Sequence, residues 1–144
     1  MVDCGGRERR TAIENAGSEL WSVRAAAGRR LAASAPDRID EVADVLHRLL
    51  LDPQDSAVTA ETAEALLARG DTVGLRHVLL ARSRAAEQWT ADEIQAALDG
   101  APGWTTARGA NRMARQLREL ATDSDEGVRE EALRRLARLR PREA

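Results

Sequence analysis

The feature that most constrains this chain is a short pattern that returns at a fixed spacing. In three places a Val is followed by a small residue four positions later and by a Leu eight positions later. The copies are Val23/Ala27/Leu31, Val58/Thr62/Leu66 and Val128/Ala132/Leu136. Residues four and eight apart lie on one face of an α-helix, so each copy predicts a helix with a narrow buried stripe.

The distance between the copies predicts a repeat architecture. Val58 follows Val23 by 35 residues, and Val128 follows Val58 by 70, which is twice 35. A fourth copy is therefore expected near position 93, where Ile94 stands in "WTADEIQAAL". A fixed period of this length with two helices per unit is typical of stacked helical repeats. The small residue at +4 would let neighbouring helices approach each other.

Composition and helix punctuation predict an all-α protein. Helix-forming residues dominate, and the only aromatic residues are three Trp. Pro36 lies just inside a helix start, Asp55 and Asp125 precede apolar runs, and Gly70-Asp71 lies between two helices. A capping box is expected at Thr90 and Glu93. The predicted helices span residues 6–16, 19–33, 36–51, 56–69, 72–85, 91–98, 105–121 and 126–139. We expect a flexible tail at 1–5, one domain at 6–140 and a second tail at 141–144.

Two segments resemble a known repeat family. "DSAVTAETAEALLARG" and "DEGVREEALRRLARL" look like the second helices of HEAT repeats, with Asp55 and Asp125 at the turn between helices. The resemblance covers about residues 18–139 and departs from the pattern at Leu20, which replaces the turn Asp. It implies a right-handed α-solenoid of about four helix pairs. Leu20 is expected to join the core with the Val, +4 and +8 residues.

Charge and cysteine usage exclude several function classes. The chain has 22 Arg, no Lys and 24 acidic residues, so its net charge of −2 gives no overall attraction to nucleic acid or an anionic membrane. Cys4 is the single cysteine and cannot complete a disulfide or zinc site within the chain. His47 and His77 lack a third ligand and are expected to be partly exposed. We expect a cytoplasmic protein with no metal and no cofactor.

The favoured hypothesis is a non-catalytic protein-binding module, such as an adaptor, scaffold or inhibitor. Stacked second helices expose the positions between their buried stripes, and this face is expected to bind a partner protein. The expected contact residues are Arg24, Arg30, Thr59, Glu64, Arg129 and Arg134. A toxin immunity protein is one form of this hypothesis. The arginines of the last helix are expected to form a solvated face, with Glu130–Arg134 and Glu131–Arg135 pairs.

An enzymatic alternative rests on a second resemblance. A HEAT-like fold is also used by bacterial alkylpurine DNA glycosylases, in which tryptophans and an aspartate surround a damaged nucleotide. Trp89, Asp92, Trp104 and Arg108 would be the matching residues here, and a DNA-binding protein is a related alternative. Packing of the two Trp over the core is the favoured interpretation, since nothing in the composition draws DNA to the chain. No residue is predicted to be catalytic.

Overall fold

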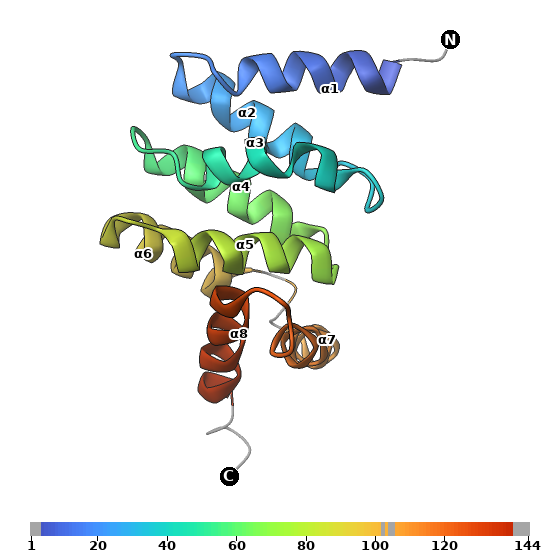
Figure 1. Ribbon diagram of the computed structural model, residues 1–144, viewed down its shortest axis with the longest axis vertical. Helices are drawn as coiled ribbons and strands as arrows, with labels where there is room; N and C mark the ends of the chain where they lie inside the picture. Colours follow the sequence, from blue (N-terminus) through green and yellow to red (C-terminus); the bar gives the residue numbers. More distant parts are fainter. Residues whose placement is uncertain (1–3, 102, 104–105, 140–144) are drawn as a thin grey trace.

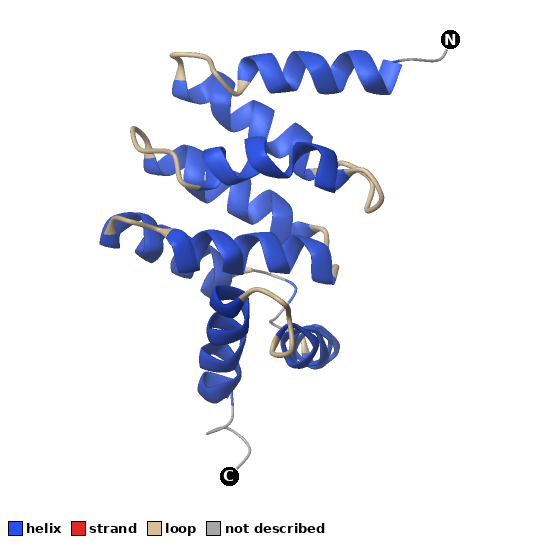
Figure 2. Cartoon of the chain, in the orientation of Figure 1, coloured by secondary structure: helices blue, strands red, loops and turns tan. Residues whose placement is uncertain are grey.

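The computed structural model describes residues 4–101, 103 and 106–139, and over them the chain is entirely helical (Figures 1 and 2). The elements are α1 (Cys4–Asn15), α2 (Trp21–Ala32), a 3-10 helix η1 (Ile39–Val42), α3 (Ala43–Leu50), α4 (Ser56–Ala68), α5 (Thr72–Arg84), α6 (Gln88–Gly100), α7 (Ala107–Leu120) and α8 (Glu126–Leu139). The predicted all-α class and the eight α-helices are confirmed. The expected tail 141–144 lies outside the described residues, as do residues 1–3 of the other tail. No helix of the described chain is both long enough and apolar enough to cross a membrane.

Three aspartates begin helices as the sequence predicts. The Asp55 carboxylate accepts a hydrogen bond from the backbone N–H of Ala57 at 2.8 Å, at the start of α4. Asp71 accepts from the N–H of Gly74 at 2.9 Å and begins α5. Before α8, Asp125 accepts from the backbone N–H of residue 128 at 3.0 Å. Each carboxylate satisfies a backbone donor that the first turn leaves without a partner.

Two predicted helix starts are wrong. α6 begins at Gln88 rather than at residue 91, and Thr90 is buried inside the helix, so its hydroxyl does not act as a cap. The expected helix start at Pro36 is replaced by a turn, because the N–H groups of Arg38 and Ile39 both bond the carbonyl of residue 35. The helical segment then begins with η1. The turn near Pro36 and the burial of Thr90 therefore determine these helix starts, and the sequence signals do not.

The helices pack in two rows over most of the chain. α2 packs against α4, and α4 packs against α6, although these helices are not consecutive. α1, α3 and α5 run across the view of Figure 1 one below another, and each contacts its neighbours in the other row. Most of the expected stripe is buried, but Val23 is only half-buried. The buried members are Ala27, Leu31, Val58, Thr62, Leu66 and Ile94.

The last two helices depart from this arrangement. α8 makes its main contacts with α5 and α7 and runs down the view of Figure 1, where α7 is seen end on. α8 therefore does not extend the row of α2, α4 and α6. Two residues of its own stripe, Val128 and Ala132, are fully buried, whereas Leu136 is only partly buried.

One expected core residue is exposed. Leu20 is 64% exposed, because it occupies the N-cap of α2 and precedes the stripe that begins at Val23. Its neighbour Trp21 is also exposed. The expectation that Leu20 belongs to the core is wrong.

Candidate functional site

Two of the expected contact residues, Arg24 and Arg129, form hydrogen bonds with loops of the chain instead of pointing freely into solvent. Arg24 and Arg129 each follow a Val of the repeated pattern by one residue, and they stand 105 residues apart, which is three times 35. In both cases the Nη1 group donates hydrogen bonds to the carbonyl oxygens six and five residues earlier, at 2.9 and 3.2 Å for Arg24 and at 2.8 and 3.2 Å for Arg129. Each side chain therefore fastens the loop that leads into its own helix.

Arg24 also forms a buried ion pair. Its Nε lies 2.9 Å from Asp52 Oδ1, and its Nη2 lies 3.2 Å from Oδ2 of the same carboxylate. Asp52 in turn accepts the backbone N–H groups of Gln54 and Asp55, at 3.2 and 2.8 Å. This network joins α2 to the loop before α4. The charges of Arg24 and Asp52 compensate each other, so neither is available to a partner protein.

The expected exposure of Arg24 and Thr59 is wrong. Arg24 is 6% exposed and Thr59 is fully buried. Thr59 occupies the same repeat position as Arg24, one residue after the Val of its copy. This position lies on the flank of the buried stripe, next to the neighbouring helix and loop.

The other expected contact residues reach the surface in different ways. Arg30 is exposed and pairs with Glu8 of α1 at 2.6 Å, while Glu64 is exposed on α4. Arg134 is exposed but lies on α8, which is not packed beside α6. Its ion pair is with Glu131, at 3.2 Å and three residues away.

The predicted ion pairs within the last helix are wrong. Glu131 is buried and pairs with Arg82 of α5 at 2.7 Å, whereas the prediction paired it with Arg135. Arg135 instead reaches Asp99 at the end of α6, also at 2.7 Å. The side chains of α8 are therefore used for packing against other helices and do not form a purely solvated face.

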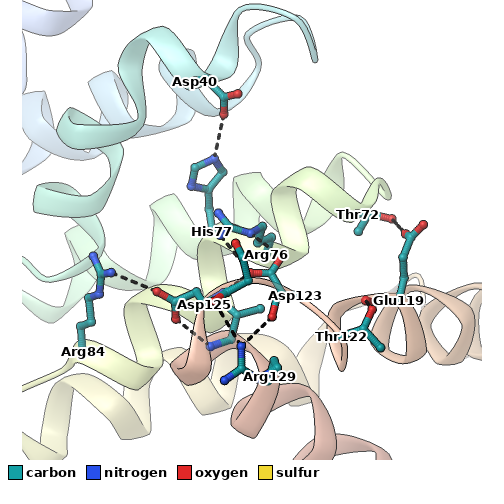
Figure 3. Close-up of polar contacts among 12 residues, drawn as sticks. Asp40, Thr72, Arg76, His77, Arg84, Glu119, Thr122, Asp123, Asp125 and Arg129 are labelled. Carbon is teal, nitrogen blue, oxygen red and sulfur yellow. Dashed lines mark hydrogen bonds and ion pairs between the residues drawn. The ribbon is translucent and has the colours of Figure 1, made fainter.

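A polar cluster fastens α5 to the last two helices (Figure 3). Arg76 of α5 forms two hydrogen bonds with Asp123 in the loop before α8, from Nε at 2.9 Å and from Nη2 at 3.0 Å. The hydrogen bond from Arg76 is the main reason that the pKa of Asp123 lies below its ordinary value. Arg84 reaches Asp125 at 3.2 Å. The cluster explains the placement of α8 on α5, and every acid in it is paired.

The two histidines lie near each other without forming a metal site. His77 is buried, contrary to the expectation of partial exposure, and its Nε2 lies 4.0 Å from Asp40 Oδ1 (Figure 3). Burial is the main cause that lowers the pKa of both His77 and His47. Among the residues that the structure describes, no three His, Cys, Asp or Glu side chains are grouped to hold a metal ion.

The residues of the glycosylase alternative are only partly described. Trp89 is 40% exposed in the first turn of α6, so the expected packing over the core is incomplete. Asp92 is exposed, and its carboxylate accepts a hydrogen bond from Gln88 Nε2 at 2.8 Å. Arg108 is exposed on α7, and Trp104 lies outside the described residues. The described part of the chain offers no observation that favours this alternative.

One cavity lies where four helices meet. It has a volume of about 550 Å³, within the range of small-molecule sites. Its lining comes from the end of α4, the start of α5, the second half of α6 and the middle of α7. Apolar and small residues predominate: Leu67, Ala68, Gly70, Leu75, Ala96, Ala97, Gly100, Ala101 and Gly103. The polar lining residues are Glu64, Asp71, Arg112 and Gln116.

Two of the polar residues that line this cavity form hydrogen bonds within the fold. Arg69 donates two hydrogen bonds to Asp71, from Nε at 3.2 Å and from Nη2 at 3.0 Å. Burial opposes the charge of Asp71, but the bonds from Arg69 and Gly74 together lower the pKa of its carboxyl. Gln116 Nε2 donates to the carbonyl of Gly70 at 2.8 Å. Sequence reasoning identified Glu64 but missed the other polar lining residues, which come together only through the packing of α7.

Comparison of the chain with protein-family models, with curated proteins and with solved structures found no match.

Proposed function

We propose that this chain is a non-catalytic protein-binding module with a HEAT-like, right-handed α-solenoid architecture. The observation that carries the proposal is the side-by-side packing of α2, α4 and α6, which places three equivalent helices in one row. The repeated use of Arg24 and Arg129 at the same step of the 35-residue period also supports it. Rows of this kind give a preorganised surface, which lowers the ordering cost of association.

The binding surface would be the outer side of this row. We call it the second-helix face and define it by the exposed residues Arg29, Arg30, Glu64, Asp92, Ala96 and Asp99. Its charge changes from basic on α2 to acidic on α4 and α6. Such segmentation selects a partner of mixed charge in a fixed orientation. An adaptor, a scaffold or an inhibitor, including a toxin immunity protein, would use the face in the same way.

The face excludes four residues of the original set. Arg24 and Thr59 are buried, and Arg129 is engaged with the loop before α8. Arg134 remains exposed on a different part of the surface, because α8 packs on α5. The strongest test of the proposal therefore uses Arg30 and Glu64.

Charge reversal on the face is the test. The protein would be immobilised and used to capture partners from the native cell extract, and the affinity of the captured partner would be measured for each variant. We expect Arg30→Glu and Glu64→Arg each to weaken binding at least tenfold, which corresponds to about 1.4 kcal/mol.

Arg118→Glu is the matched control, since Arg118 is exposed on α7, a helix outside the row of α2, α4 and α6. It should leave the affinity of the captured partner unchanged. Equal losses from all three variants, or no loss from any, would contradict binding through the second-helix face.

A further inference from the structure

The cavity between α4, α5, α6 and α7 contains a cation that the fold does not neutralise. Arg112 of α7 lines the cavity. Among the described residues, no carboxylate lies within 4.0 Å of its guanidinium. Most of the structural arginines discussed above pair with acids, as Arg24, Arg76 and Arg135 do. Arg112 is therefore available to an anion that enters the cavity.

Two glycines lie beside the guanidinium group of Arg112. A Cβ atom on Gly70 would lie 3.7 Å from the central carbon of Arg112, and a Cβ on Gly103 would lie 3.2 Å from its Nη2. Gly70 has a φ of 75°, in the left-handed region that favours glycine, and forms the turn between α4 and α5. The hydrogen bond from Gln116 to its carbonyl fixes this turn against α7. At 3.2 Å a Cβ on Gly103 would crowd the guanidinium group, whereas at 3.7 Å a Cβ on Gly70 would make an ordinary contact with it.

The remaining charges of the cavity do not compete for this cation. Asp71 is paired with Arg69 and caps α5, so its charge is already compensated. Glu64 is exposed, where water screens its charge. The rest of the wall is aliphatic, with Leu67, Leu75 and Ala97 among its members.

We propose that this cavity binds a small organic carboxylate with an aliphatic body. The carboxylate would pair with the Arg112 guanidinium, whose planar donors match two carboxylate oxygens. The aliphatic body would pack against the wall formed by α4, α5 and α6. Its removal from water would favour binding. The cavity shares Glu64 and Ala96 with the second-helix face. Its proposed ligand is a small molecule that pairs with Arg112, so the inference goes beyond the proposed protein-binding function.

The test uses two probes that share a six-carbon chain. Hexanoate carries the carboxylate, and 1-hexanol lacks a charge. Each would be titrated into the isotope-labelled full chain at neutral pH, and backbone amide chemical shifts would be recorded by NMR. We expect saturable shifts at Gly70, Ala97 and Gln116 with hexanoate, and an affinity for 1-hexanol at least tenfold weaker.

Variants on α7 separate the cation from general apolar binding. Arg112→Gln should weaken hexanoate binding at least tenfold, whereas Arg115→Gln, at an exposed position of the same helix, should not change it. Equal affinity for the two probes, unaltered binding by Arg112→Gln, or no saturable shift in the millimolar range would each overturn the proposal. The comparison of the two probes uses the unaltered chain, so it decides the question even if Arg112→Gln does not fold.

Discussion

At the scale of single residues, helix geometry explains the burial of some of the expected contact residues. An α-helix advances about 100° per residue, so the stripe at positions 0, +4 and +8 has its centre near 40°. Position +1 lies about 60° from that centre, and position +6 lies about 160° from it. Arg24 and Thr59 occupy +1 and are buried, while Glu64 and Arg134 occupy +6 and are exposed. The angle alone does not separate all six residues, because Arg30 at +7 also lies about 60° from the centre and is exposed.

The buried pair of Arg24 and Asp52 gives a prediction at this scale. Arg24→Met would leave the Asp52 carboxylate buried without its cation, since the two side chains are 8% and 6% exposed. Removing one partner of a buried ion pair costs about 3–5 kcal/mol. Urea denaturation would measure the loss in the free energy of unfolding.

The control for this prediction is an exposed arginine on the same helix. Arg29 pairs with Glu61, but its side chain is 51% exposed. Arg29→Met should therefore change the free energy of unfolding by only about 0–1 kcal/mol. Similar losses from Arg24→Met and Arg29→Met would show that burial does not set the strength of these pairs.

At the scale of helices, the contact between α2 and α4 depends on a missing side chain. A Cβ atom on Gly28 would lie 2.1 Å from Thr62 Oγ1 and 3.2 Å from Thr62 Cβ. Thr62 is the small +4 residue of its copy, and it is fully buried. The sequence pattern predicted a close approach at Thr62, and Gly28 is the partner that it did not identify.

This contact predicts opposite outcomes for two substitutions. Gly28→Ala should destabilise the protein by about 1–3 kcal/mol, because the added carbon overlaps the Thr62 hydroxyl. Thr62→Ala should be nearly neutral or stabilising, since the buried Oγ1 has no hydrogen-bond partner among the described residues.

A double-mutant cycle checks that the two effects share one cause. The combined variant should be more stable than the sum of the single effects predicts, because Thr62→Ala removes the overlapping oxygen. Thermal or urea denaturation of the four proteins would measure this coupling. Additive effects would mean that Gly28→Ala acts through the α2 backbone and not through its contact with α4.

The sequence predicts the start of a helix where a nearby side chain determines it. Asp55, Asp71 and Asp125 begin their helices as expected, because an Asp side chain can satisfy first-turn N–H groups without help from the rest of the fold. The start of α6 could not be predicted from Thr90, since tertiary burial of that residue determines its role. The cavity around Arg112 could not be predicted from the sequence either, because it depends on the angle at which α7 meets α4 and α6.

At the scale of the whole molecule, the repeat pattern predicts which residues are buried better than it predicts how their helix is oriented. Val128 and Ala132 of the α8 stripe are buried, as the 35-residue period predicts, yet α8 packs mainly against α5 and α7. Gly127 allows this contact, since a Cβ there would lie 2.5 Å from Ser83 Oγ. The pairs Arg76–Asp123 and Arg82–Glu131 then hold α8 in place. These polar partners are far apart in the sequence, and periodicity carries no information about them.

The same long-range packing gives the molecule a predicted dependence on pH. Burial lowers the pKa of His77 and of His47 below 6.5, with Asp40 opposing the shift at His77 and Asp44 opposing it at His47. Arg76, Arg69 and the mutual repulsion of the two imidazoles act in the same direction as burial at His77, and Arg84 does so at His47. Both histidines are therefore neutral in the folded protein over a range in which the unfolded chain binds protons.

The sign of the effect follows from this difference in proton binding. The contribution of the histidines is fully present above about pH 6.5, and it is lost as the pH falls below that value toward their folded-state pKa values. Asp71, Asp99 and Asp123 also have lowered pKa values, but their contribution is lost only below about pH 3.8. Urea denaturation between about pH 7.5 and 5 should show stability decreasing toward acid, and the double variant His47→Gln/His77→Gln should show a flatter profile. A profile of the same slope in the double variant would assign the dependence to other groups.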